Sequence, residues 1–177
     1  MSRLAKELVK VRKLDRFGAA GAAGAGAAGA GAAGGGRDDY GFIVELAPVD
    51  ESDLSRWYAV IEGPAGTPYE GHNFKLAIAV PAGYPMVPPE FKFEATRDGG
   101  FKVPPHCNVD RSTGEICLDI LKPAGWTPIW DLLHVTQAVY ILLQEPEPDS
   151  PLDVDMAQIT RSNDKGALYG IVNYYLS

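Results

Sequence analysis

The sequence predicts an α+β domain in which a four-stranded antiparallel sheet follows an N-terminal helix and precedes several C-terminal helices. Four short segments separated by turn residues occupy the middle of the chain. Helical spacing of apolar residues marks both the first 17 residues and the last third. A length of 177 residues with 46% apolar residues is enough for one domain with its own core. We therefore expect a single domain over residues 1–177.

The N-terminal segment predicts a short amphipathic helix over residues 3–16. Leu4, Leu8 and Val11 recur at i, i+4 and i+7, and the opposite face is basic. Residues 18–36 then contain ten alanines and nine glycines and no other residue. Because each glycine costs about 1 kcal/mol relative to alanine in a helix, we predict that residues 18–36 are a flexible Ala/Gly tether to the first strand.

The middle of the chain predicts an antiparallel meander. Strands are expected at residues 42–47, 57–62, 74–80 and 90–95. Glycine and proline pairs in the intervening segments favour short turns, which join neighbouring antiparallel strands. Residues 84–89 contain three prolines, which remove backbone donors and exclude regular structure there.

The last third predicts helices. Thr127 is a suitable N-cap and Pro128 suits the first helical position, so a buried apolar helix is expected from there to Pro146. Two shorter helices are expected at 154–161 and 165–175.

The segment 96–126 has little regular pattern, and a long irregular segment in a compact domain is often functional. It contains His106, Cys107, Asn108 and Cys117. A disulfide between the two cysteines would occupy a nucleophile and is not expected in a reducing compartment. The histidine and cysteine positions lack the paired spacing of a zinc site, so no metal and no cofactor are expected.

Charge and hydropathy exclude several classes of protein. The net charge of −7 and the pI of about 4.9 argue against a nucleic-acid binder, which needs a basic face. No apolar run approaches the ~20 residues of a membrane-spanning helix. The first 17 residues lack the apolar core of a secretory signal, and two cysteines are too few for a disulfide framework. These features predict a cytoplasmic protein.

Several motifs in a fixed order resemble those of the ubiquitin-conjugating enzymes. They are a basic first helix, Thr-Pro-Tyr-Glu-Gly at 67–71, Tyr-Pro-x-x-Pro-Pro at 84–89, His-x-Asn at 106–108, Ile-Cys-Leu at 116–118 and Trp-x-Pro at 126–128. The segments 117–123, 126–134, 149–155 and 170–176 resemble the peroxisomal branch of that family. The resemblance covers nearly the whole chain outside the tether.

The resemblance implies that Cys117 accepts the C-terminal carbonyl of ubiquitin as a thioester and passes it on. Without the family resemblance, a buried inert thiol would be as good an interpretation of Cys117 as a nucleophile. Asn108 matches an asparagine that donates to the oxyanion formed during transfer, and an asparagine that holds a turn is the alternative. His106 is interpreted as structural.

Three positions depart from the family pattern. Cys107 stands where the family has proline after His106, and the loop that ends at Cys117 is one residue longer than in common members. At the gate position, where many members have an acid before Pro-Leu, this chain has Ser150 with Asp149 beside it. Because that acid is thought to help deprotonate an attacking lysine, we hypothesise weaker transfer to lysine than to a cysteine thiol.

The resemblance also implies partners: ubiquitin, the ubiquitin-activating enzyme, a RING-type ubiquitin ligase and a membrane-anchored peroxisomal protein. Contacts with the activating enzyme and ligase would involve Arg3, Lys6, Lys10, Phe74, Pro128 and Ile129. An exposed Phe74 would be a binding anchor and a buried one part of the core, and the strand pattern leaves both open.

The implied function is transfer of ubiquitin to a peroxisomal import receptor by a cytoplasmic protein that is peripheral at the peroxisomal membrane. Two alternatives are a catalytically silent ubiquitin-binding scaffold of the same fold and a cysteine protease. Cys117 argues against the scaffold, and the absence of a protease signature around His106 or His134 argues against the protease.

Overall fold

The computed structural model describes residues 2–18 and 40–177. Its elements follow the predicted order, with α1 at Arg3–Gly18, β1 at Ile43–Asp50, β2 at Asp53–Glu62, β3 at Asn73–Ala79, β4 at Glu90–Glu94, a 3₁₀ helix η1 at Asp119–Leu121, α2 at Leu132–Gln144, α3 at Val154–Ser162 and α4 at Lys165–Leu176. Nearly all of the predicted tether, residues 19–36, lies outside the described residues. In the part that is described, no helix is long and apolar enough to cross a membrane.

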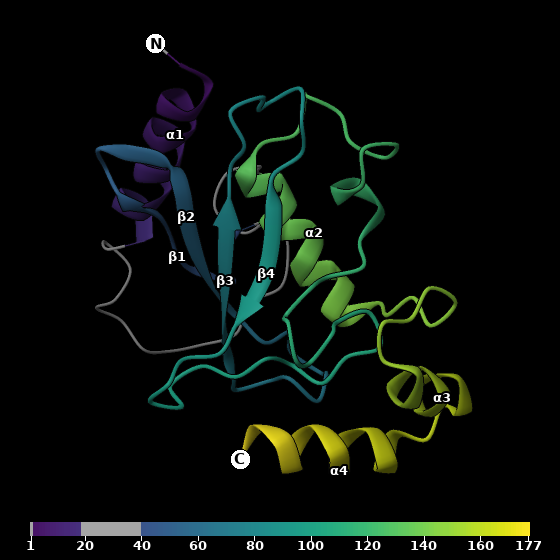
Figure 1. Ribbon diagram of the computed structural model, residues 1–177. Helices are drawn as coiled ribbons and strands as arrows, with labels where there is room; N and C mark the ends of the chain where they lie inside the picture. The colour runs from purple at the N-terminus through teal and green to yellow at the C-terminus, as the bar shows by residue number, and fades with distance from the viewer. Residues whose placement is uncertain (1, 19–39) are drawn as a thin grey trace, which may run out of the picture.

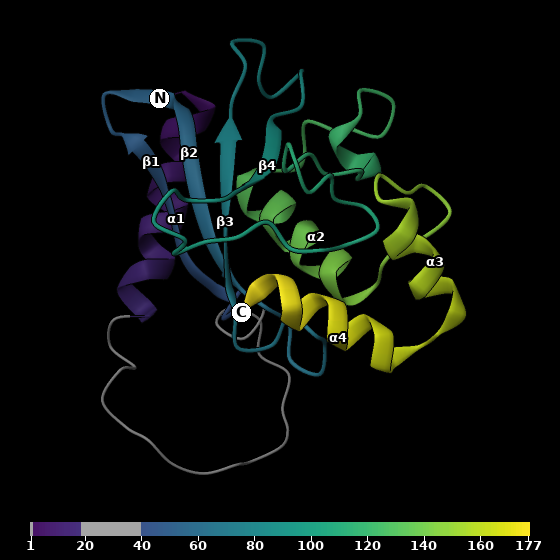
Figure 2. The ribbon, with the colours of Figure 1, turned by 60° about the horizontal axis from the view of Figure 1, so that its bottom comes forward.

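The four strands form one antiparallel sheet in the order β1-β2-β3-β4, which confirms the predicted meander. Figure 1 shows α2 lying across one face of this sheet, with α1 beside β1 and β2. Figure 2, turned by 60°, shows α3 on the far side of α2 and α4 running back from it. The helices α1 and α3 therefore flank the body formed by the sheet and α2.

The strand β3 illustrates how alternation builds the core. Phe74, Leu76 and Ile78 are buried, while the residues between them face the other side of the sheet. Phe74 pairs with Ile61 in the register of β2 and is only 1% exposed. The structure therefore decides the question left open by the sequence: Phe74 is a core residue, and the expected partner contact through it is corrected.

The start of α2 also differs from the prediction. Residues 127–130 form a turn closed by a hydrogen bond from Trp130 N to the Thr127 carbonyl, 3.1 Å long. The helix N-cap is Asp131, whose Oδ1 accepts from His134 N at 2.9 Å. Asp131 is as good a cap as threonine, and Lys10 fixes its second oxygen from α1. Pro128 therefore lies in the turn before the helix.

A buried carboxylate joins α1 to this turn. Glu7 is 5% exposed, and its oxygens accept from Arg3 Nε at 2.7 Å, from the Tyr84 hydroxyl at 2.7 Å and from Leu132 N at 3.1 Å. Arg3 also donates to the Trp130 carbonyl at 3.0 Å. Because every one of these partners is a donor, the buried charge is compensated.

Candidate functional site

Cys117 lies on a rigid segment at the edge of an open groove. Its backbone N–H donates to the Asn108 carbonyl at 2.8 Å, and the preceding Ile116 forms a bridge with Val109. Cys117 is free and partly exposed, and it lines a groove of about 400 Å³ together with β4 residues, Lys122 and Leu152. An acyl group carried on its sulfur would therefore be open to an incoming nucleophile.

The loop between Asn108 and Cys117 is closed by a tight turn at residues 110–114. The Asp110 carbonyl accepts from Gly114 N at 2.7 Å, and the Asp110 side chain accepts from the backbone of Ser112 and Thr113. Gly114 has φ +73°, and an added Cβ would lie 1.9 Å from the Phe93 carbonyl oxygen, so only glycine fits. With this turn, the loop keeps Asn108 and Cys117 in direct backbone contact.

The side chain of Asn108 is directed at the loop 147–150. Its Nδ2 donates to the carbonyls of Glu147 at 2.7 Å and Ser150 at 3.1 Å, and its Oδ1 accepts from Glu147 N at 2.8 Å. Asn108 is completely buried. Both amide hydrogens that the expected oxyanion role would use are thus bonded to the loop in this structure. Asn108 is a clamp: its backbone holds Cys117 and its side chain holds the loop.

The gate position lies on that clamped loop. Ser150 and Asp149 are both exposed, and the Asp149 carboxylate is 3.6 Å from the guanidinium of Arg161 on α3. Arg161 also donates to the Pro148 carbonyl at 2.6 Å. Asp149 thus provides an exposed carboxylate, but one that faces an arginine on α3.

His106 orients the clamp from within the core. Its Nδ1 accepts from Asn108 N at 3.0 Å, so its Nε2–H donates to the Leu142 carbonyl at 3.0 Å. Burial lowers the pKa of His106 to about 4, although the bond to Leu142 opposes this. The neutral imidazole therefore fits the predicted structural role.

We predict that His106 makes the protein less stable in mild acid. Its pKa is lower in the folded state than the ~6.5 of an unfolded chain, so folding favours the neutral ring. This contribution is complete above pH ~6.5 and is lost as the pH falls towards 4, up to about 3 kcal/mol. Urea unfolding at several pH values should show a shallower pH slope in His106→Asn.

Because carboxylates also titrate in this range, the difference in slope between variants is the measurement that matters. His72→Gln is the matched control and should leave the slope unchanged, because His72 lies outside the core and its side chain makes no hydrogen bond or ion pair with the described residues. Equal slopes in the wild type and His106→Asn would contradict the prediction.

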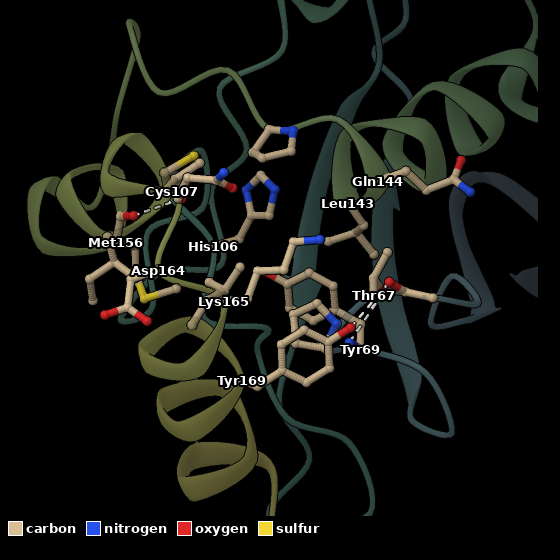
Figure 3. Close-up of a pocket in the computed structure, with 17 residues that line it drawn as sticks. Thr67, Tyr69, His106, Cys107, Leu143, Gln144, Met156, Asp164, Lys165 and Tyr169 are labelled. Carbon is tan, nitrogen blue, oxygen red and sulfur yellow. Dashed lines mark hydrogen bonds between the residues drawn. The ribbon is translucent and has the colours of Figure 1, made fainter.

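A second cavity lies away from Cys117. It has a volume of about 260 Å³ and is enclosed mainly by α3, α4, the end of α2 and the segment 66–69. Figure 3 shows Cys107 and His106 in its wall, with Met156 and Lys165 around it. The Cys107 thiol donates to Asn108 Oδ1 at 3.2 Å, and burial raises its pKa. Cys107 is therefore a poor nucleophile that supports the clamp.

Apart from the buried Phe74, the predicted partner residues fall into two groups. Lys6 is exposed on α1, and Ile129 is 82% exposed on the turn before α2, next to the half-buried Pro128. In contrast, the charged groups of Arg3 and Lys10 bind the protein's own turn. Arg3 donates to the Trp130 carbonyl, and Lys10 pairs with Asp131. The two basic side chains thus fix the turn that presents Ile129.

Sequence reasoning did not single out Lys122, which the structure places in the groove of Cys117. It lines the groove with Cys117, and its ammonium pairs with Asp119 at 2.7 Å. The sequence shows Lys122 five residues after Cys117 in the Cys-Leu-Asp-Ile-Leu-Lys motif. It does not show the 3₁₀ turn between them, which brings Lys122 into the same groove as Cys117.

Known proteins share both the sequence and the fold. Residues 38–172 match the family described as "Ubiquitin-conjugating enzyme". The chain is 53% identical over 137 residues to the ubiquitin-conjugating enzyme E2-21 kDa of Saccharomyces cerevisiae, covering 77% of this chain and 72% of that protein. It is 44% identical over 126 residues to Protein PEROXIN-4 of Arabidopsis thaliana, covering 71% and 75%.

Among solved structures, the chain is similar to the ubiquitin-conjugating enzyme Pex4p of H. polymorpha, crystallised in complex with the soluble domain of Pex22p. The TM-score is 0.77 at 35% identity, over 99% of this chain and 97% of that one. Because the family match covers most of the chain, and because a partly exposed cysteine lies at the family's motif, the chain belongs to the ubiquitin-conjugating enzymes and is of the peroxin-4 type.

Proposed function

We propose that the chain carries ubiquitin as a thioester on Cys117 and transfers it to a peroxisomal import receptor. The observation that carries this is the partly exposed sulfur of Cys117 on a segment hydrogen-bonded to Asn108. A thioester keeps its carbonyl reactive towards thiols and amines, so the chain can act as a relay.

The test is a loading reaction with ubiquitin-activating enzyme, ATP and ubiquitin. A band that carries one ubiquitin and disappears on treatment with a thiol reductant is the expected result. Absence of any adduct would instead support a silent ubiquitin-binding scaffold, and cleavage of a peptide would support a protease.

The gate position supports a cysteine as the receptor's acceptor. Ser150 offers no carboxylate, and Asp149 faces Arg161. A thiol of pKa ~8.5 is already a few per cent ionised at neutral pH and depends less on a carboxylate than an amine of pKa ~10.4 does. We expect loaded enzyme to discharge faster to free cysteine than to free lysine at pH 7.5. Equal rates would rule out this preference.

For location, the proposal is a cytoplasmic enzyme bound at the peroxisomal membrane through a membrane-anchored partner. The similarity to Pex4p, whose structure was solved with the soluble domain of Pex22p, supports it. Binding of the chain to a Pex22p-type soluble domain, measured by calorimetry, is the direct test.

The remaining partners are the activating enzyme and a RING-type ligase. We propose that Lys6, Pro128 and Ile129 contact them, with Arg3 and Lys10 holding the turn in place. An apolar side chain that is 82% exposed on a fixed turn is a suitable anchor.

We predict that Ile129→Ala weakens ligase binding about ten-fold, because an anchor residue contributes on the order of 1–2 kcal/mol. Its unfolding free energy should change by less than about 0.5 kcal/mol, since Ile129 is exposed. Val154→Ala is the matched control, because Val154 is 68% exposed at the start of α3. Equal affinity of the wild type and Ile129→Ala for the ligase would contradict the prediction.

A further inference from the structure

The transfer reaction needs a hydrogen-bond donor, and the Asn108 amide is already bonded to the loop 147–150 in this structure. When a nucleophile adds to a thioester carbonyl, the carbonyl oxygen becomes an oxyanion that a hydrogen-bond donor stabilises. Both Nδ2 hydrogens of Asn108 have acceptors, Glu147 O and Ser150 O, and the residue is completely buried. In this structure Asn108 has no free amide hydrogen to offer, so we looked for another donor among the residues that line the groove of Cys117.

Two cations line this groove among the described residues, Lys92 and Lys122. Lys92 projects from β4 and pairs with Glu115 across a bridge between their backbones, at 3.3 Å. The other carboxylate in the groove lining is Glu90. Both lysines thus pair with a carboxylate. They differ in how the chain connects them to Cys117.

Lys122 is brought to Cys117 by the 3₁₀ turn that follows the cysteine. Leu121 N donates to the Leu118 carbonyl and Lys122 N to the Asp119 carbonyl, each at 3.0 Å. Its ammonium binds Asp119 Oδ1 at 2.7 Å and its side chain is 53% exposed. The hydrogen bond to Asp119, and after it the negative charge of an ionised Cys117, raise the pKa of Lys122. The ammonium is therefore charged at neutral pH, and the Lys122 side chain lines the same groove as Cys117.

Resting on the proposed thioester function, we propose that Lys122 is a catalytic residue whose ammonium donates a hydrogen bond to the oxyanion formed at the Cys117 thioester. Asp119 is the positioning residue that keeps the ammonium at the end of the 3₁₀ turn. Of the two groove lysines, Lys122 lies at the end of the 3₁₀ turn that follows Cys117, whereas Lys92 lies on β4.

In this step the nucleophile's electron pair forms a bond to the thioester carbon, and the π pair moves onto the carbonyl oxygen. Collapse re-forms the C=O bond and breaks the C–S bond, so Cys117 leaves as a thiolate beside Lys122. An attacking amine loses its proton to solvent, while an attacking thiolate has none to lose. The ammonium keeps its proton throughout and stabilises first the oxyanion and then the thiolate.

Single-turnover discharge of preloaded enzyme to free cysteine tests the proposal. We expect Lys122→Gln to slow discharge about ten-fold, less than the ~10²–10³ of a fully enclosed donor because the groove is open to water. Lys122→Arg should keep most of the rate, because a guanidinium is also a charged donor. Lys92→Gln is the matched control and should stay within about two-fold of the wild type.

A loaded Lys122→Gln variant that discharges at the wild-type rate overturns the role of Lys122 and leaves the proposed function intact. An equal loss of discharge rate in Lys122→Gln and Lys92→Gln also overturns the role of Lys122, because the effect would then come from the overall charge of the groove. A wild-type enzyme that never forms the adduct overturns the proposed function itself.

Discussion

Cys117→Ala is expected to abolish the ubiquitin adduct completely, whereas Cys107→Ala should load at the wild-type rate. The two thiols are ten positions apart in the sequence but lie in different environments. Cys117 is partly exposed at the groove, and Cys107 is 1% exposed with its thiol donating to Asn108. A buried thiol with a raised pKa is a weak nucleophile, so only Cys117 can accept an acyl group.

The measurement is the loading gel, run with and without thiol reductant. Cys107→Ala should also lose about 1–2 kcal/mol of unfolding free energy, because it removes a buried sulfur and one partner of Asn108. Cys117→Ala should lose less, since its sulfur is partly exposed. An adduct that survives in Cys117→Ala, or that disappears in Cys107→Ala, would show that the thiols have been assigned the wrong roles.

The meander was predictable because its signals are local. Alternation along residues 74–80 and the turn glycines and prolines determine strands and their connections without any information from distant residues. The N-cap of α2 was not predictable in the same way. Thr127 and Asp131 are both good caps, and the choice depends on Lys10, which lies 121 residues earlier in the chain.

In the site, too, the sequence indicates which residues matter but does not indicate how their side chains are oriented. The motif around Cys117 singled out a cysteine that the structure leaves free and partly exposed, and the buried, hydrogen-bonded ring of His106 fits its structural interpretation. The direction of the Asn108 side chain depends on loop 147–150, and the position of Lys122 depends on a 3₁₀ turn. Neither contact leaves a periodic pattern in the sequence, so neither could be deduced from it.

Asn108→Ala is expected to spare loading and to slow discharge, because it releases the loop 147–150 and leaves Cys117 in place. The bond from Cys117 N to the Asn108 carbonyl is a backbone contact and survives the substitution. The side-chain bonds to Glu147 and Ser150 are lost, which leaves backbone groups of the loop without their buried partner. We expect a loss of about 3 kcal/mol in unfolding free energy.

The loop is where the effect should concentrate. Amide hydrogen exchange at Glu147 should accelerate strongly, since its N–H loses the Asn108 oxygen, while exchange in β3 should change only by the global loss of stability. Discharge should slow because Leu152, which lines the groove, lies two residues after the end of this loop.

Two further variants distinguish the clamp from a direct contact between the Asn108 amide and the reacting carbonyl. Asn108→Asp keeps the acceptor for Glu147 N but sets a carboxylate against the carbonyls of Glu147 and Ser150, so it should be at least as harmful as alanine. Asn73→Ala removes an exposed asparagine and should change neither stability nor discharge. If Asn108→Ala keeps wild-type stability and exchange yet still discharges slowly, its amide acts on the reacting carbonyl, and the oxyanion role would return from Lys122 to Asn108.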